Sequence, residues 1–117
     1  MLVDTSIWVD HLRRGRRDLV DLLENGAVLC HLFIVGELAC GNLSNRSEVL
    51  DLLKALPALD PVSPDEVLYF VEENEIMGRG LGYVDVHLLA SAQLADARIW
   101  TTDRRLREVG NDLGMVL

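Results

Sequence analysis

The stretch Leu2-Val3-Asp4-Thr5-Ser6 places an acid at the point where a short apolar strand ends and a helix can begin. The stretch Ile99-Trp100-Thr101-Thr102-Asp103 ends an apolar strand with an acid in the same way. Ligands of open α/β sheets bind beyond the carboxyl ends of the strands. The sequence therefore predicts that Asp4 and Asp103 share one site at the edge of a parallel sheet.

Short apolar strands alternate with helical segments along the rest of the chain. We expect strands at residues 2–4, 27–30, 58–62, 97–101 and 115–117. We expect helices at residues 6–13, 18–24, 64–78 and 104–109, around Glu37, after Ser44 or Asn45, and after Asp85. In the 64–78 helix, the residues expected to face inward are Val67, Leu68, Val71 and Ile76. This alternation predicts a three-layer α/β/α sandwich around a central parallel sheet, formed by one domain spanning residues 1–117.

The composition limits the class of protein. Hydrophobic residues make up 50% of the chain and aromatic residues 5%, which predicts a core of leucine, valine, isoleucine and alanine. No apolar run reaches the roughly 20 residues that a membrane span needs, and the N-terminus lacks the features of a signal peptide. We therefore expect a cytoplasmic protein with no membrane contact, in which Cys30 and Cys40 are buried free thiols. The net charge of −8 argues against a protein that coats nucleic acid generally.

Two further acids interrupt apolar segments. Glu37 is the only charge in residues 32–41, and Asp85 opens the run Val86-His87-Leu88-Leu89-Ala90. A helix that is hydrophobic on all sides is buried, so Glu37 is expected to lie in the interior. Each acid also has a simpler explanation: an arginine could satisfy Glu37, and the three aspartates could cap helices.

A metal ion would account for all four acids together. Two like charges about 4 Å apart repel by about 4 kcal/mol at an effective dielectric of about 20, so converging carboxylates need a compensating cation. Carboxylate oxygens suit Mg²⁺ or Mn²⁺, whereas zinc favours histidine and cysteine. The three histidines, His11, His31 and His87, do not show metal-ligand spacing.

Two groups of arginines follow two of the acids. One group comprises Arg13, Arg14, Arg16 and Arg17, and the other comprises Arg104, Arg105 and Arg107. They could be solvated helix faces, or they could form a positive rim that draws a polyanion toward the acidic site. The glycine-rich segment 78–82 is expected to end a helix and to lead flexibly into Asp85.

These segments together resemble the PIN-domain ribonucleases, and in particular the VapC-type toxins of bacterial toxin–antitoxin pairs. The resemblance rests on Val3-Asp4-Thr5-Ser6, Gly36-Glu37-Leu38, residues 82–90 and Thr101-Thr102-Asp103, which occur in the family's order and cover nearly the whole chain. It implies an acidic pocket at the carboxyl edge of the sheet, in which Asp4, Glu37, Asp85 and Asp103 bind Mg²⁺ or Mn²⁺ for endonucleolytic cleavage of RNA.

The resemblance also implies roles for other residues and partners. Asp4 and Asp85 would be the principal metal ligands, with Thr5, Ser6 and Thr101 as supporting polar residues. Members of the family usually form homodimers and are neutralised by a small antitoxin whose tail fills the active-site groove. Trp8 and the leucine-rich helices could supply such a surface, or they could pack in the core.

The predicted reaction is metal-assisted hydrolysis of a phosphodiester bond, with one or two metal ions. Arg13, Arg14, Arg104 and Arg105 could hold the flanking phosphates. A PIN-like domain that only binds a partner is one alternative, but loss of an acid is its usual mark and all four are present. A receiver or phosphatase domain that forms an aspartyl phosphate is another, although Asp4 is unpaired and no lysine follows Lys54.

Overall fold

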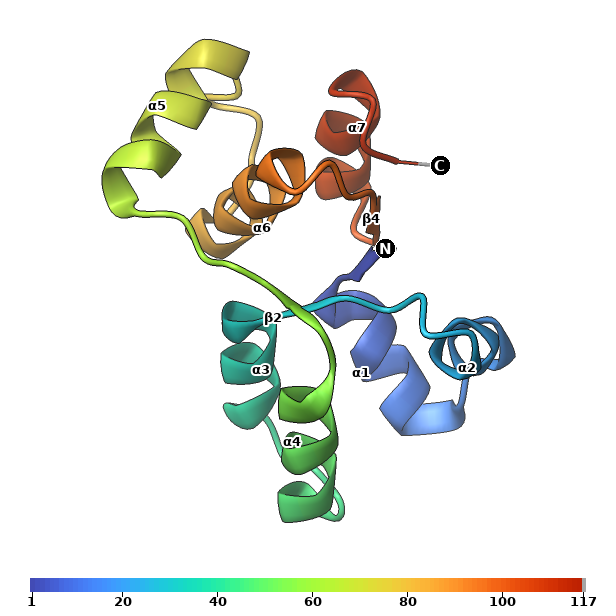
Figure 1. Cartoon of the computed structure of the whole chain (residues 1–117). Coiled ribbons are helices and arrows are strands. Elements are labelled where there is room, and N and C mark those ends of the chain that lie inside the picture. Colours follow the sequence, from blue (N-terminus) through green and yellow to red (C-terminus); the bar gives the residue numbers. More distant parts are fainter. Residues whose placement is uncertain (117) are drawn as a thin grey trace.

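The computed structural model describes residues 1–116, in which short parallel strands alternate with helices (Figure 1). The elements in chain order are β1 (Leu2–Val3), α1 (Thr5–Arg14), α2 (Arg17–Glu24), β2 (Cys30–His31), α3 (Leu32–Ala39), α4 (Arg46–Ala55), β3 (Ala58–Leu59), α5 (Pro64–Asn74), α6 (Tyr83–Leu94), β4 (Ile99–Trp100) and α7 (Arg104–Asp112). The predicted α/β sandwich with a parallel sheet is confirmed.

The strands pair in parallel. β1 lies beside β4, with Leu2 opposite Ile99, and β2 lies beside β3. A single parallel bridge between Leu2 and Leu29 joins the two pairs, which gives the spatial order β3-β2-β1-β4. β1 and β4 are therefore neighbours, and their carboxyl ends lie at the same edge of the sheet.

Each strand is two residues long, which is shorter than we expected. α1 begins two residues after β1 ends, and α3 begins directly after β2, so the chain leaves the sheet almost at once. The expected fifth strand is wrong for residues 115 and 116, which form no strand. Met115 nevertheless accepts a hydrogen bond from the backbone N–H of Ile99 (2.8 Å), and Leu117 lies outside the described residues.

The centre of the core is α6. All seven residues from Val86 to Ala92 are buried, and α6 packs against the neighbouring α5 (Figure 1). Leu2, Ile7, Ile34 and Leu89 pack in the same core with no exposed surface. The helix that is enclosed on all sides is therefore α6, at whose first turn Asp85 lies.

Several expectations about the helices are wrong. α5 ends at Asn74, before Gly78, because Glu75 adopts the left-handed conformation with φ 51°. Leu68 faces outward and is 61% exposed. For Trp8 the sequence left open a partner surface or core packing, and the structure shows core packing.

The two cysteines differ in their surroundings. Both are free thiols, but only Cys30 is buried, so the expectation of burial is wrong for Cys40. Within residues 1–116, the structure has no helix that is both long enough and apolar enough to cross a membrane.

Candidate carboxylate site

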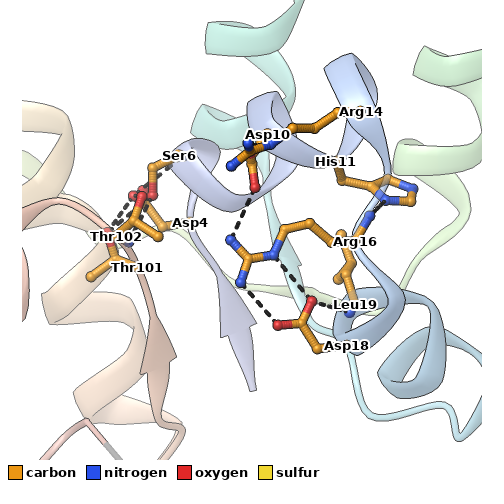
Figure 2. Close-up of polar contacts among 10 residues, drawn as sticks. All are labelled: Asp4, Ser6, Asp10, His11, Arg14, Arg16, Asp18, Leu19, Thr101 and Thr102. Carbon is orange, nitrogen blue, oxygen red and sulfur yellow. Dashed lines mark hydrogen bonds and ion pairs between the residues drawn. The ribbon is translucent and has the colours of Figure 1, made fainter.

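Asp4 lies at the junction of β1 and α1, where it is the residue that caps the helix. Its side chain is only 5% exposed. The carboxylate oxygen Oδ2 accepts hydrogen bonds from the hydroxyl of Ser6 (2.8 Å) and from the hydroxyl of Thr101 (2.7 Å) (Figure 2). Because Thr101 directly follows β4, the pairing of β1 with β4 is what brings these groups together.

Two backbone amides orient the hydroxyls that bind Asp4. The N–H of Thr102 donates to the Ser6 hydroxyl oxygen (3.1 Å), and the N–H of Asp103 donates to the Thr101 hydroxyl oxygen (3.0 Å). A hydroxyl has a single proton, so each of these hydroxyls accepts from the backbone and donates to Asp4. The Asp4 carboxylate is thus fixed by an ordered network before any ligand arrives (Figure 2).

Glu37 lies on α3 and is exposed, so the expectation that it is buried is wrong. α3 turns Ile34 and Leu38 into the core, while its other side is open to solvent and even leaves Leu32 63% exposed. The Glu37 Oε1 accepts a hydrogen bond from the hydroxyl of Thr5 (2.7 Å). This contact ties Glu37 to the residue next to Asp4.

Asp85 is in the first turn of α6, where its Oδ2 accepts a hydrogen bond from the backbone N–H of Gly82 (3.2 Å). Burial raises the pKa of Asp85 above its usual value, and the negative charges of Asp4, Asp103 and Glu37 raise it further. The bond from Gly82 acts in the opposite direction. The charges of Asp4, Glu37 and Asp103 therefore act on Asp85, although the four residues come from separate segments of the chain.

Asp103 caps α7, and its Oδ1 accepts a hydrogen bond from the backbone N–H of Leu106 (3.0 Å). A helix cap is the simpler of the two roles that the sequence leaves open for Asp103. Asp4 and Asp85 also contribute to helix starts, so a structural role and a place in the site coexist in the same side chains.

Each of the four carboxylates keeps one oxygen without a hydrogen-bond partner among residues 1–116. The engaged atoms are Asp4 Oδ2, Glu37 Oε1, Asp85 Oδ2 and Asp103 Oδ1. The second oxygen of each group remains available for a cation or for water. An all-oxygen donor set of this kind suits Mg²⁺ or Mn²⁺.

The spacing of these carboxylates determines how a metal ion could bind. Across residues 1–116, no three histidine, cysteine, aspartate or glutamate side chains already stand together as a metal cage. Mg²⁺ does not need such a cage, because it usually keeps several waters and binds one or two carboxylates together with substrate phosphates. The residues therefore fit a weakly enclosed magnesium or manganese ion.

The arginines that we expected at the rim differ in their partners. Arg14 pairs with Asp10 (2.6 Å) and Arg104 pairs with Glu108 (3.1 Å), each one helical turn away. Arg13 and Arg105 have no carboxylate partner in the described chain. Arg16 is held by Asp10 and Asp18 (Figure 2). It also lies over the ring of Trp100, so it is a structural residue of the α1–α2 turn.

The histidines belong to the packing and not to the carboxylate site. His87 is 3% exposed, and its ring lies edge-on to the rings of Phe33 and Tyr83. His31 caps α3 by accepting a hydrogen bond from the N–H of Phe33 (3.0 Å). Burial lowers the pKa of both rings, which disfavours the protonated forms.

Hollows in the surface flank the carboxylates. A cavity of about 670 Å³ lies on one side of Glu37 and has a mainly apolar lining that includes Leu32, Phe33 and Val84. Another, of about 570 Å³, lies between α1 and the end of α3 and is lined by Glu37 and Arg13. Thr101 lines a third cavity, of about 730 Å³, between α2 and α7.

The sequence matches the PIN domain family over residues 1–112, which includes all four carboxylates. The chain belongs to the PIN domain family. Two relatives are Ribonuclease VapC32 from Mycobacterium tuberculosis strain CDC 1551 / Oshkosh and Ribonuclease VapC32 from strain ATCC 25618 / H37Rv. Each is 44% identical over 118 residues, an overlap that covers 100% of this chain and 95% of the relative. The resemblance to VapC-type PIN domains is therefore confirmed over the full length.

Two features of this PIN domain were missed in the sequence. Thr102 contributes through its backbone N–H, and Gly82 contributes in the same way to Asp85. Backbone donors leave no mark in the pattern of side chains. Ser6 and Thr101 were indicated by the resemblance to PIN domains, and both bind Asp4 in the structure.

Proposed function

We propose that this PIN domain is an endoribonuclease that depends on Mg²⁺, or on Mn²⁺, and that acts as the toxin of a bacterial toxin–antitoxin pair. The observation that carries the proposal is the gathering of acids beside Asp85: Thr101, which follows β4, binds Asp4, Thr5 binds Glu37, and the charges of Asp4, Asp103 and Glu37 act on Asp85. Burial and three neighbouring carboxylates disfavour its charge, and a divalent cation would relieve that repulsion. The similarity to two proteins named as ribonucleases supports RNA as the substrate.

Asp4 and Asp85 would hold the cation, and Glu37 and Asp103 would complete the negative site. When bound, a divalent cation activates water and polarises the scissile phosphate. The protein's own contribution is to hold the carboxylates in place. Ser6 and Thr101 fix Asp4, and Thr5 fixes Glu37. The oxygens left without a partner then remain directed to solvent, cation or substrate.

The proposed setting is the cytoplasm, with a small antitoxin as partner and a second copy of the chain in a homodimer. Exposed apolar side chains support a protein partner. Leu32 is 63% exposed and Tyr83 is 56% exposed, and Phe33 and Val84 lie beside them around the apolar cavity next to Glu37. We call these four residues the α3–α6 apolar face and propose that it pairs with the same face of a second copy.

The test is cleavage of single-stranded RNA by the purified chain with Mg²⁺, with Mn²⁺ and with excess chelator. We expect Asp4→Asn and Asp85→Asn to lower the rate by about 100-fold or more, the scale at which losing one preorganised electrostatic contact slows an enzyme. Asp96→Asn is the matched control. It removes the same charge from an exposed residue beyond the far end of α6, where asparagine also tolerates the left-handed backbone (φ 53°).

Equal cleavage by wild type and by both site variants, or full activity in chelator, would overturn the proposal. Intact folding of each variant is checked by thermal unfolding. A chain that binds RNA but never cuts it, whatever the metal, would instead be a binding module.

A further inference from the structure

The side chain of Arg105 lies across Gly80. A Cβ atom placed on Gly80 would stand 2.8 Å from Arg105 Cδ and 2.8 Å from its Nη1, closer than real Cβ contacts allow. Gly80 also has φ +82°, a left-handed conformation that suits glycine. We call the space that the Arg105 side chain occupies beside Gly80 the Gly80 seat. This space is open only because residue 80 has no side chain.

This seat joins the segments that carry Asp85 and Asp103. Gly80 precedes Gly82, whose N–H binds the Asp85 carboxylate, and Arg105 lies in the first turn of α7 after Asp103. A second contact holds the same two segments together, because Arg79 pairs with Asp112 of α7 (2.8 Å). The Arg105 side chain therefore lies between the segment that leads to Asp85 and the helix that Asp103 caps.

Arg105 also differs from its neighbours in charge. The positive charge of Arg104 is offset by Glu108, and that of Arg14 is offset by Asp10. Within residues 1–116, no carboxylate pairs with Arg105. A guanidinium whose charge is not offset by a carboxylate can bind a phosphate with two parallel hydrogen bonds.

We propose that Arg105, seated on Gly80, binds a phosphate of single-stranded RNA beside the scissile bond, and that glycine is required at position 80 to keep this seat open. The inference rests on the proposed nuclease function and assigns one substrate contact within it. Arg105 is a substrate-binding residue, and Gly80 is a positioning residue that acts through it.

The role of Arg105 is tested by measuring RNA binding to the Asp4→Asn protein, in which cleavage should not interfere with the measurement. Binding of a fluorescent single-stranded RNA is followed by anisotropy at several salt concentrations. Adding Arg105→Ala should weaken binding about tenfold, as expected for a lost hydrogen bond to a charged group. It should also reduce the slope of log affinity against log salt by about 0.7, the value for one phosphate contact on a single strand.

Arg98→Ala is the matched control for charge. Arg98 is exposed and precedes β4, at the opposite edge of the sheet from the carboxylates. Its loss changes the net charge by the same amount, but it should leave the salt slope unchanged. Equal effects of Arg105→Ala and Arg98→Ala would overturn the proposal.

The Gly80 seat is tested by comparing RNA binding by Gly80→Ala with RNA binding by Gly78→Ala. Both glycines have positive φ, so both variants carry a similar backbone strain, but a Cβ on Gly78 would meet nothing within 4 Å. Gly80→Ala should therefore weaken RNA binding like Arg105→Ala, whereas Gly78→Ala should not. In the double variant Gly80→Ala/Arg105→Ala, binding should be no weaker than with Arg105→Ala alone.

The outcomes separate this inference from the proposed function. If Asp4→Asn abolishes cleavage but Gly80→Ala binds RNA as Gly78→Ala does, the seat is wrong and the nuclease assignment stands. If Asp4→Asn and Asp85→Asn both cleave RNA as wild type does, the proposed function itself fails.

Discussion

At the scale of single residues, each of the four carboxylates uses one oxygen to hold the chain, and the other has no partner in the part of the chain that the structure describes. Asp103 shows the division most simply, because its Oδ1 caps α7 through the N–H of Leu106. The same side chain adds to the charge that raises the pKa of Asp85. The structural and the electrostatic contributions can therefore be separated by substitution.

We predict that Asp103→Ser and Asp103→Ala will separate the capping role of Asp103 from its electrostatic role. Serine can still cap the helix, so Asp103→Ser should leave the free energy of unfolding nearly unchanged, whereas Asp103→Ala should lower it by about 1 kcal/mol. Both variants remove the charge and should reduce RNA cleavage to a similar extent. Chemical denaturation and a cleavage assay test this prediction. If Asp103→Ser cleaves as wild type does, Asp103 is only a cap.

Part of this arrangement could be predicted from residues alone. An acid directly after an apolar strand identified Asp4 and Asp103, because the carboxyl ends of parallel strands meet at one edge. Ser6 and Thr101 were indicated only by the resemblance to PIN domains. The exposure of Glu37 could not be predicted in the same way. The apolar sequence of α3 records which side chains are hydrophobic, but whether another element covers them depends on the tertiary structure.

At the scale of elements, the start of α3 depends on a neutral histidine. His31 Nδ1 accepts a hydrogen bond from the N–H of Phe33, and Nε2 lies 3.0 Å from the hydroxyl of Ser91 in α6. Nδ1 must be unprotonated to accept, so Nε2 carries the proton and donates to Ser91. Burial lowers the pKa of His31 below its usual value of 6.5, and the nearby His87 lowers it further.

The sign of the resulting pH dependence follows from this shift. Because folding favours the neutral ring, the stabilisation is complete above pH 6.5 and is lost as the pH falls from 6.5 toward the lowered pKa. We predict that the free energy of unfolding will decrease from pH 7.5 to pH 5.5, by up to about 1.4 kcal/mol per pH unit for each buried histidine.

The variant His31→Asn should weaken this pH dependence, because asparagine can cap α3 without titrating. Its absolute stability will be lower, since His31 is fully buried, so the slope with pH is the quantity to compare. His11→Asn, at a partly exposed histidine, is the control. A slope that His31→Asn leaves unchanged would contradict the prediction.

At the scale of the whole molecule, the order of the helices and strands could be predicted, but the residues at which they begin and end could not. The alternation of strands and helices predicted the parallel sheet correctly. The early end of α5 depends on the left-handed conformation of Glu75, which the sequence does not favour. The outward position of Leu68 is equally hidden, since nothing in the periodicity shows which apolar residues remain uncovered.

Uncovered apolar residues lead to a prediction about assembly. If the α3–α6 apolar face pairs two copies of the chain, Leu32→Glu should convert the dimer into a monomer, because it places two like charges in the interface. Leu94→Glu, at a leucine that is also exposed but lies at the far end of α6, should leave the dimer intact. Light scattering coupled to size-exclusion chromatography measures both. A wild-type chain that is monomeric at micromolar concentration would contradict this prediction.

The central claim is that carboxylates from four segments of the chain form one site for a divalent cation. Calorimetric titration of the purified chain with Mn²⁺ tests it most directly, since it needs no RNA and no antitoxin. We expect binding to the wild type, loss of that binding in Asp4→Asn and in Asp85→Asn, and unchanged binding in Asp96→Asn. Absence of binding to the wild type, or binding that survives in both site variants, would contradict it.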